Sequence, residues 1–270
     1  MAIFYLWISL FAFHQGLLPS VMASPPQVNV TEESLTRQAT FIFKGTVVKL
    51  NATTMSAVRA SESTAVVRID EVIDAPGAPP DLAGKEITVQ LREPGSIRAG
   101  QQMFFFTKGW LLGNSMAVIE VGRLGGSQSA QQISEAVRAT RQKMADEELQ
   151  GEMVRSEVIV VGRVSSVRPS KAPHIGSEHD PDWYEAQITV ESVVRGNLPA
   201  RTTMLLFPHS DDVMWKASPK FKEGQQGIWL LHRNQARLSG IEDQFTALKS
   251  IDFQTVDQHE RVLRLVKTLE

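Results

Sequence analysis

The chain has 270 residues, a formal net charge of −2 and no cysteine. This length suffices for about two domains of ordinary size, and the balanced charge argues against a nucleic-acid partner, which needs an excess of Lys and Arg to contact phosphates. Without cysteine, neither disulfide bonds nor a lipid anchor attached to cysteine is available, so stability must come from hydrophobic cores.

The N-terminus has the pattern of a secretory signal peptide. Residues 1–23 contain no Lys, Arg, Asp or Glu, and residues 3–13 are almost wholly apolar. Val21 and Ala23 are the small residues expected before a cleavage at Ser24. An uncleaved membrane anchor is the alternative, but the apolar run is shorter than the roughly 20 residues that a spanning helix needs. We therefore expect an exported protein, secreted or periplasmic, with no membrane span after cleavage.

The first half of the mature chain predicts a short helix followed by several short strands. Thr31 is a suitable N-cap, and the acidic residues after it favour a helix over residues 31–39. A strand pattern follows over residues 40–50, with Gly45 near its middle, where glycine commonly marks a bulge or a sharp bend. Gly113 begins a turn between two further strand patterns, which predicts a hairpin.

The second half repeats the first. Residues 158–164 (VIVVGRV) match residues 41–47 (FIFKGTV), and each is a β-rich run interrupted by one glycine. Later strand patterns follow in the same order, and the closest match pairs residues 99–106 with residues 223–230. Each copy also ends in a helical pattern, so a duplication is the simplest explanation.

These patterns predict a mainly β (α+β) fold of two tandem OB-like β-barrels, each followed by an amphipathic helix. Between the copies, apolar residues recur at helical spacing among charged and polar ones, which indicates a linking helix. The predicted divisions are a signal peptide over residues 1–23, a first barrel over 24–126, a linking helix over 127–150, a second barrel over 151–240, and a closing strand with a C-terminal helix over 241–270.

Three segments of the second copy follow one another in a recognisable order. They are residues 156–164 (SEVIVVGRV), residues 188–196 (ITVESVVRG), and Glu223 and Gly224 before the apolar residues 228–231. This order resembles the TIMP/netrin-like branch of OB-fold domains. The resemblance implies an extracellular or cell-envelope module that binds another macromolecule. Metalloprotease inhibitors of that family chelate the protease zinc through an N-terminal cysteine, and that mechanism does not carry over to a chain without cysteine.

Two loops of the second copy are rich in groups that bind metal ions. Loops distant in sequence can meet at one rim of a barrel, and histidine with carboxylates suits zinc or another divalent ion. The spacing matches no metal motif, so a solvated polar loop is the alternative interpretation. The candidate ligands are His174, His179, Asp180 and Asp182 in the first loop, and His209 and Asp211 in the second.

Aromatic residues of the second copy form another candidate site. Trp183, Tyr184 and Trp215 are candidates for binding a ligand by stacking on a sugar or a peptide. Trp183 and Trp215 lie in polar sequence contexts, so we expect both to be partly exposed. Trp229 lies in an apolar run and is predicted to belong to the core.

Motifs for catalysis are missing from the sequence. It contains no G-x-S-x-G motif, no phosphate-binding glycine loop and no H-E-x-x-H motif. We therefore expect a non-catalytic binding or scaffold module that recognises a macromolecular partner, either another exported protein or an envelope component. No cofactor is expected apart from a divalent metal at the His and Asp loops. The alternative is a metal-dependent hydrolase that uses those loops.

Overall fold

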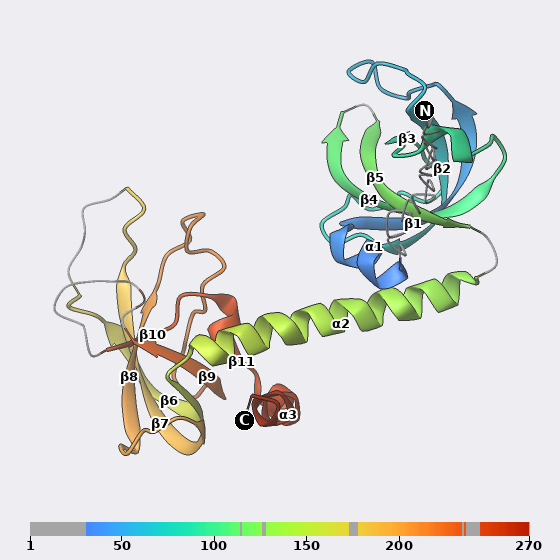
Figure 1. Ribbon diagram of the computed structural model, residues 1–270. Coiled ribbons are helices and arrows are strands. Elements are labelled where there is room, and N and C mark those ends of the chain that lie inside the picture. The colour runs from blue at the N-terminus through green and yellow to red at the C-terminus, as the bar shows by residue number, and fades with distance from the viewer. Residues whose placement is uncertain are drawn as a thin grey trace, which may run out of the picture. The chain divides into compact units, whose positions relative to one another are not determined.

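A computed structural model gives the fold and describes residues 31–113, 115–125, 128–172, 178–233, 235 and 244–269 (Figure 1). The predicted signal peptide lies outside these residues. Over the described ranges the chain is mainly β and forms two closed five-stranded barrels, each followed by a helix, which confirms the predicted fold class. No helix in these ranges is both long and apolar enough to cross a membrane.

The first barrel has OB-like connectivity. Its strand order is β1-β2-β3-β5-β4, and the pairing of β1 with β4 closes the ring. The β3–β5 pair is parallel, whereas the other four pairs are antiparallel. Leu112 pairs with Met116 around Gly113, which confirms the predicted hairpin. The elements are α1 (Glu32–Gln38), β1 (Phe41–Leu50), β2 (Thr64–Asp74), β3 (Glu86–Gln90), the 3-10 helix η1 (Pro94–Ser96), β4 (Gln102–Leu112) and β5 (Met116–Gly125).

The second barrel repeats this connectivity. Its ring runs β6-β7-β8-β10-β9, and its one parallel pair, β8–β10, stands where the first barrel has β3–β5. The short strand β11 adds to the outer edge of β9. The elements are α2 (Ala130–Arg155), β6 (Val158–Pro169), β7 (Trp183–Arg195), β8 (Thr202–Pro208), β9 (Gln226–Arg233), β10 (Phe245–Thr246), η2 (Ser250–Asp252), β11 (Phe253–Gln254), η3 (Val256–Gln258) and α3 (His259–Lys267).

The central glycines mark bulges, as the sequence predicts. The register of β1 on β2 shifts between Lys44 and Gly45, and that of β6 on β7 shifts between Val161 and Gly162. A Cβ atom on Gly162 would collide with the carbonyl oxygen of Thr189 on the neighbouring strand. Glycine therefore lets the paired strands approach closely at the point where each barrel wall bends.

Each barrel buries apolar residues on both faces of its central strands. Inside the first barrel, the ring of Phe43 stacks against Phe41 and Phe105, with centroids 4.7 and 5.3 Å apart. Trp229 belongs to the interior of the second barrel and is fully buried, as predicted. A second apolar cluster covers the outside of each barrel, where α1 and α2 pack on the first barrel and α2 and α3 pack on the second. This double burial explains why the strands are continuous apolar runs rather than alternating ones.

Helix α2 belongs to both copies of the repeat. Its first half is the helix that follows the first barrel, and its last turns are the helix that precedes the second barrel. Ser129 and Gln132 form a capping box at its start. Ile133 and Val137, in its first half, pack on the first barrel, much as α3 packs on the second. Its last turns contribute Met153 to the second barrel's outer cluster and lead directly into β6, as α1 leads into β1. The helix therefore ends at Arg155 rather than at residue 150.

Candidate functional site

The β6–β7 and β8–β9 loops of the second barrel, which contain the predicted His and Asp ligands, meet at one rim. The ring nitrogen of Trp215 donates to the carbonyl oxygen of His179 at 2.6 Å. The backbone N–H of His209 donates to the carbonyl oxygen of Asp182 at 2.8 Å. The Nδ1 atom of His179 lies 3.1 Å from Oδ2 of Asp212. These contacts fasten the two loops to each other.

Asp212 organises a tight turn in the β8–β9 loop. Its side chain accepts a hydrogen bond from the backbone N–H of Met214 at 2.8 Å, and its carbonyl oxygen accepts from Trp215 and Lys216 at 2.9 and 2.8 Å. Hydrogen bonds from the Met214 backbone and then from the His179 ring hold the pKa of the Asp212 carboxyl below its ordinary value. Ser218 anchors the end of the turn by donating to the carbonyl oxygen of Leu248 at 2.5 Å.

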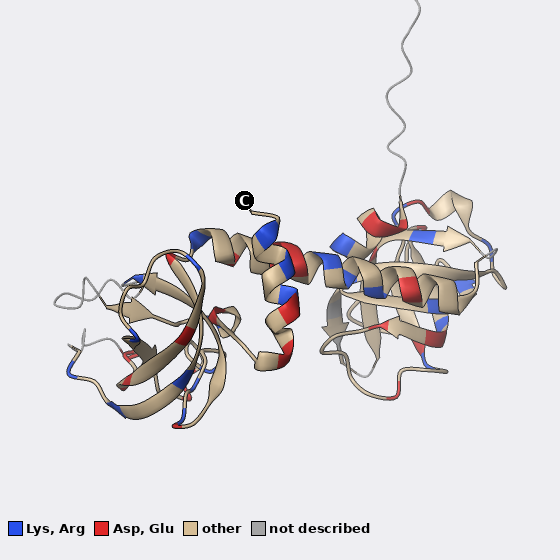
Figure 2. Cartoon of the chain, turned by 90° about the horizontal axis from the view of Figure 1, so that it is seen from below, with Lys and Arg blue, Asp and Glu red and all other residues tan. Residues whose placement is uncertain are grey.

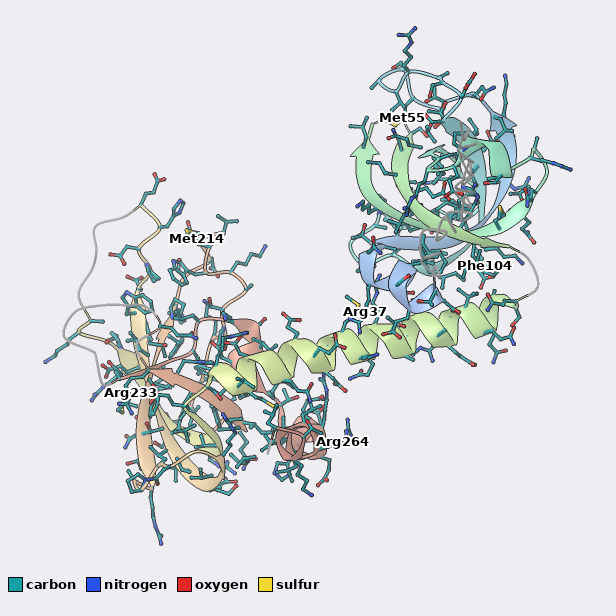
Figure 3. The ribbon with its side chains drawn as sticks, viewed as in Figure 1. Arg37, Met55, Phe104, Met214, Arg233 and Arg264 are labelled. Atoms are coloured by element: carbon teal, nitrogen blue, oxygen red, sulfur yellow. The ribbon has the colours of Figure 1, made fainter. Side chains whose placement is uncertain are left out.

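This turn carries an exposed apolar pair, Val213 and Met214, which we call the rim tip. The exposed fractions are 81% for Val213 and 60% for Met214, the two largest among the exposed large hydrophobic residues of the described chain. Figure 3 labels Met214 on the β8–β9 loop. Trp215 follows directly and packs edge-on against Trp183, with centroids 5.7 Å apart. The rim tip is therefore an apolar projection on a base that is held by hydrogen bonds and by aromatic packing.

The predicted aromatic site is only partly exposed. Trp215 and Tyr184 are half-buried, whereas Trp183 is 5% exposed, so its expected exposure is wrong. Trp183 begins β7 and packs with Ala172 and Leu206 in a small apolar cluster, a contact that its polar neighbours in sequence do not reveal. Trp183 therefore packs beneath Trp215 as part of the apolar base of the rim, and its ring is not available for stacking on a ligand.

The predicted metal ligands that the structure describes lie on these two loops of the second barrel. His174 lies outside the described residues. The ring of His209 stacks on Tyr184, with centroids 4.5 Å apart, and the ring of His179 faces Asp212. Asp180, Asp182 and Asp211 lie on the same loops. In the described part of the chain, the group of three ligand atoms within 4.8 Å of one another is a different one, formed by Glu152, His232 and Asp252.

This buried triad, Glu152, His232 and Asp252, joins three elements: the end of α2, the end of β9 and η2. The exposed fractions are 2%, 3% and 0%. His232 Nε2 lies 3.3 Å from Glu152 Oε1 and 3.4 Å from Asp252 Oδ1. Burial acts to raise the pKa of Glu152, but hydrogen bonds from Arg155 and Lys249 outweigh it and hold that pKa below its ordinary value.

None of the three residues of the buried triad is among the predicted site residues. The repeat does contain one indication that Glu152 is buried. When the two copies are aligned on Gly45 and Gly162, Glu152 takes the position of Leu35, a core residue of the first copy. A carboxylate at a core position calls for a buried partner. His232 follows the apolar run of β9, and Asp252 lies in a short turn, so neither position suggests a site by itself.

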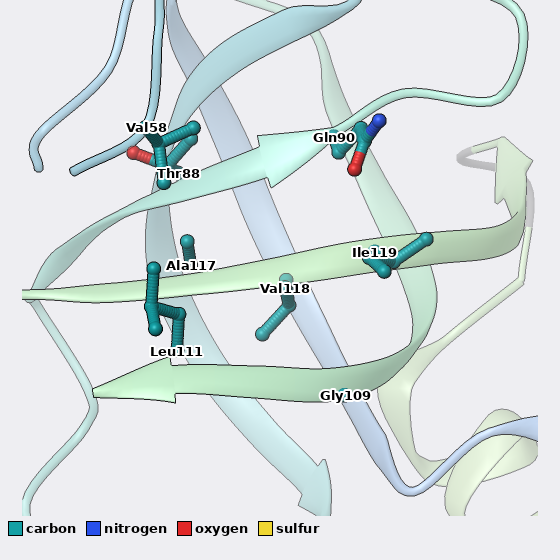
Figure 4. Close-up of a pocket in the computed structure, with 8 residues that line it drawn as sticks. All are labelled: Val58, Thr88, Gln90, Gly109, Leu111, Ala117, Val118 and Ile119. Atoms are coloured by element: carbon teal, nitrogen blue, oxygen red, sulfur yellow. The ribbon is translucent and has the colours of Figure 1, made fainter.

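The first barrel has a shallow apolar groove on its outer surface, with a volume of about 290 Å³. Gly109 and Ala117 are small and leave space between the larger side chains of Leu111 and Ile119, both of which are exposed (Figure 4). The groove crosses β3, β5 and β4, and Val58 from the β1–β2 loop contributes to its lining.

Charged residues of both signs are interspersed over the helices and barrels (Figure 2). This mixture agrees with the formal net charge of −2. Comparison of the chain with protein-family models and with curated proteins found no match. Function must therefore be inferred from the geometry of the sites themselves.

Proposed function

We propose that the chain is an exported, non-catalytic binding module that recognises another exported or envelope protein through the rim tip. The observation that carries this proposal is the exposure of Val213 and Met214, 81% and 60%, on a turn whose backbone is fixed by Asp212. Large apolar side chains that enter a partner's pocket dominate binding energy, and a pre-ordered loop loses little entropy when it binds.

The charges beside the rim tip favour a protein partner over a membrane surface. Asp211 and Asp212 precede the tip, and Lys216 follows it. An anionic lipid surface attracts clusters of Lys and Arg and repels carboxylates. A pocket on a protein accepts an apolar pair flanked by charges of both signs. The partner is therefore a protein with an apolar pocket.

Two sequence features support an exported protein that binds a macromolecule outside the cell or in its envelope. The predicted signal peptide over residues 1–23 would export the chain. The resemblance to TIMP/netrin-like domains implies a module that binds macromolecules outside the cell or in its envelope. The metal-dependent hydrolase at the His and Asp loops stays a prediction, since His174 lies outside the described residues.

Site-specific photo-crosslinking in the native host tests this proposal. A photoreactive amino acid replaces Met214 in one protein and Val256, an equally apolar exposed residue of η3, in a matched control. We expect one protein to be crosslinked reproducibly from position 214 and not from position 256. Identical products from both positions, lipid adducts alone, or no product from position 214 would contradict the proposal.

A further inference from the structure

The spacing of the buried triad fits a metal ion. Its three ligand atoms all lie within 4.8 Å of one another. His232 Nε2 is 3.3 Å from Glu152 Oε1 and 3.4 Å from Asp252 Oδ1. Ligands bound tetrahedrally to zinc at 2.0–2.1 Å lie about 3.3–3.4 Å from each other. One ion could therefore contact all three side chains with little movement of their atoms.

Two atoms of the buried triad have no hydrogen-bond partner, although both are almost wholly buried. They are Nε2 of His232 and Oδ1 of Asp252, and they face each other. Buried polar atoms are normally paired, so such atoms require an explanation. A cation between them would satisfy both at once.

Backbone hydrogen bonds fix the orientation of the Asp252 carboxylate, as a metal ligand requires. Its other oxygen, Oδ2, accepts hydrogen bonds from the backbone N–H groups of Leu248 and Lys249 at 2.8 and 2.9 Å. These bonds fix the carboxylate so that Oδ1 points toward His232. Outer contacts of this kind commonly orient the ligands of metal sites.

Lys249 and Arg155 bind the carboxylate of Glu152 and would compete with a metal ion for it. Lys249 Nζ lies 3.0 Å from both carboxylate oxygens, and Arg155 donates to Oε2. The side chains of Lys249 and Arg155 are both more than half exposed. Lys249 can therefore turn into solvent and free Oε1 for a metal ion, while Arg155 stays on Oε2.

We propose that Glu152, His232 and Asp252 bind one divalent transition-metal ion, with Zn²⁺ as the best fit. A histidine nitrogen beside two carboxylates suits zinc rather than magnesium or calcium, which prefer oxygen ligands alone. The site is structural because its residues are too buried to meet a substrate. The ion joins the end of α2 to β9 and η2, and none of its ligands belongs to the rim tip.

Zinc alone is the probe that tests this site. The purified full chain is stripped with a chelator and titrated with Zn²⁺ by calorimetry, with Mg²⁺ as the comparison ion. We expect one Zn²⁺ per chain, a higher Tm with zinc than without, and no comparable response to Mg²⁺. An absence of stoichiometric zinc binding by the wild-type chain overturns the proposal, and means that His232 serves only as an ion-pair partner of the two carboxylates.

Two variants locate the bound ion. Asp252→Asn keeps an oxygen that can accept from Leu248 and Lys249, so it preserves the turn while weakening the metal ligand. His179→Gln removes a histidine of the rim and leaves the buried triad intact. We expect Asp252→Asn to weaken zinc binding at least tenfold and His179→Gln to leave it unchanged. The opposite pattern overturns the proposal, because it places the zinc at the rim.

Discussion

Gly162 shows how one residue controls the curvature of a barrel. Its missing side chain lets β7 approach β6, since a Cβ would collide with the carbonyl oxygen of Thr189. We expect Gly162→Ala to lower the free energy of unfolding by about 1–3 kcal/mol, the usual cost of forcing extra atoms into a packed site. Urea unfolding followed by circular dichroism measures this loss.

Gly151 provides the matched control for that substitution. It lies inside α2, where a Cβ would meet only the guanidinium of Arg155 at an ordinary distance of 3.5 Å. Alanine favours helices over glycine by about 1 kcal/mol, so Gly151→Ala should leave stability unchanged or raise it. Equal effects of the two substitutions would contradict the role assigned to Gly162.

Asp70 gives the first barrel a pH-dependent contribution to stability. Burial acts to raise the pKa of Asp70, but hydrogen bonds from Thr46, Gln102 and Arg68 outweigh it and hold that pKa below its ordinary value. A carboxyl with a lowered pKa in the folded state stabilises the protein above its unfolded pKa, about 3.9 for Asp. That contribution is lost as the pH falls through the lower pKa that Asp70 has in the folded state.

We therefore expect Asp70→Asn to destabilise the chain at pH 7 by about 1–3 kcal/mol, since it weakens hydrogen bonds to a charged group. The difference from wild type should shrink below about pH 4 as Asp70 becomes protonated in both states. Chemical unfolding at several pH values measures it, with Asp81→Asn at an exposed position as the control. A difference that stays constant down to pH 3 would contradict this explanation.

The helix before each barrel ends in carbonyl groups that an arginine satisfies, but the two copies use different arginines. In the first, Arg141 from α2 donates to the carbonyl oxygens of Thr36 and Ala39 and pairs with Asp74 at 2.8 Å. In the second, Arg195 donates to the equivalent carbonyls, those of Met153 and Ser156. Arg195 pairs with Ile159 in the sheet as Asp74 pairs with Ile42, so it occupies the place of Asp74.

Arg141 therefore fastens α2 to α1 and to the first barrel. We expect Arg141→Met to destabilise the chain by about 1–3 kcal/mol, because it leaves Asp74 and two helix-end carbonyls without their donor. Amide exchange in α1 should become faster in this variant. Arg138→Met, at an exposed position of the same helix, is the control. Equal unfolding free energies for the two variants would show that the Arg141 contacts contribute nothing.

The elements that follow from local pattern were predictable, and those set by distant contacts were not. The curvature at Gly45 and Gly162, the hairpin at Gly113 and the short helix before β1 all appear in the sequence, because glycine geometry and helix caps act over a few residues. The sequence pattern alone places the last turn of α2 in the second barrel, since nothing local separates a linking helix from the first helix of the next copy.

The candidate sites divide in the same way. Barrel topology alone indicates that the His and Asp loops can meet at one rim. It does not indicate the burial of Trp183, because the apolar contacts of Trp183 come from residues such as Leu206 on another strand. His232 and Asp252 are separated from Glu152 by much of the second copy, so only the folded chain brings them together.

At the scale of the whole chain, the two copies share a barrel but differ in the connection that carries the rim tip. The strands β3 and β4 are joined by residues 91–101, whereas β8 and β9 are joined by residues 209–225. Both connections end in the same turn, in which Gly100 and Gly224 donate to the carbonyl oxygens of Val47 and Val164 at 2.8 and 2.9 Å. The rim tip thus lies in a longer loop that the second copy alone has, and such loops commonly carry function on a repeated scaffold.

The affinity of the crosslinked partner for the purified chain tests the central claim most directly. The double variant Val213→Ser, Met214→Ser changes only exposed side chains, so its Tm should equal that of wild type, and Val256→Ser is the control. If the rim tip fills a pocket on the partner, Kd should rise about tenfold or more in the double variant, as expected for losing at least 1.4 kcal/mol of apolar contact. An unchanged Kd in the double variant would contradict the proposal that the rim tip is the binding site.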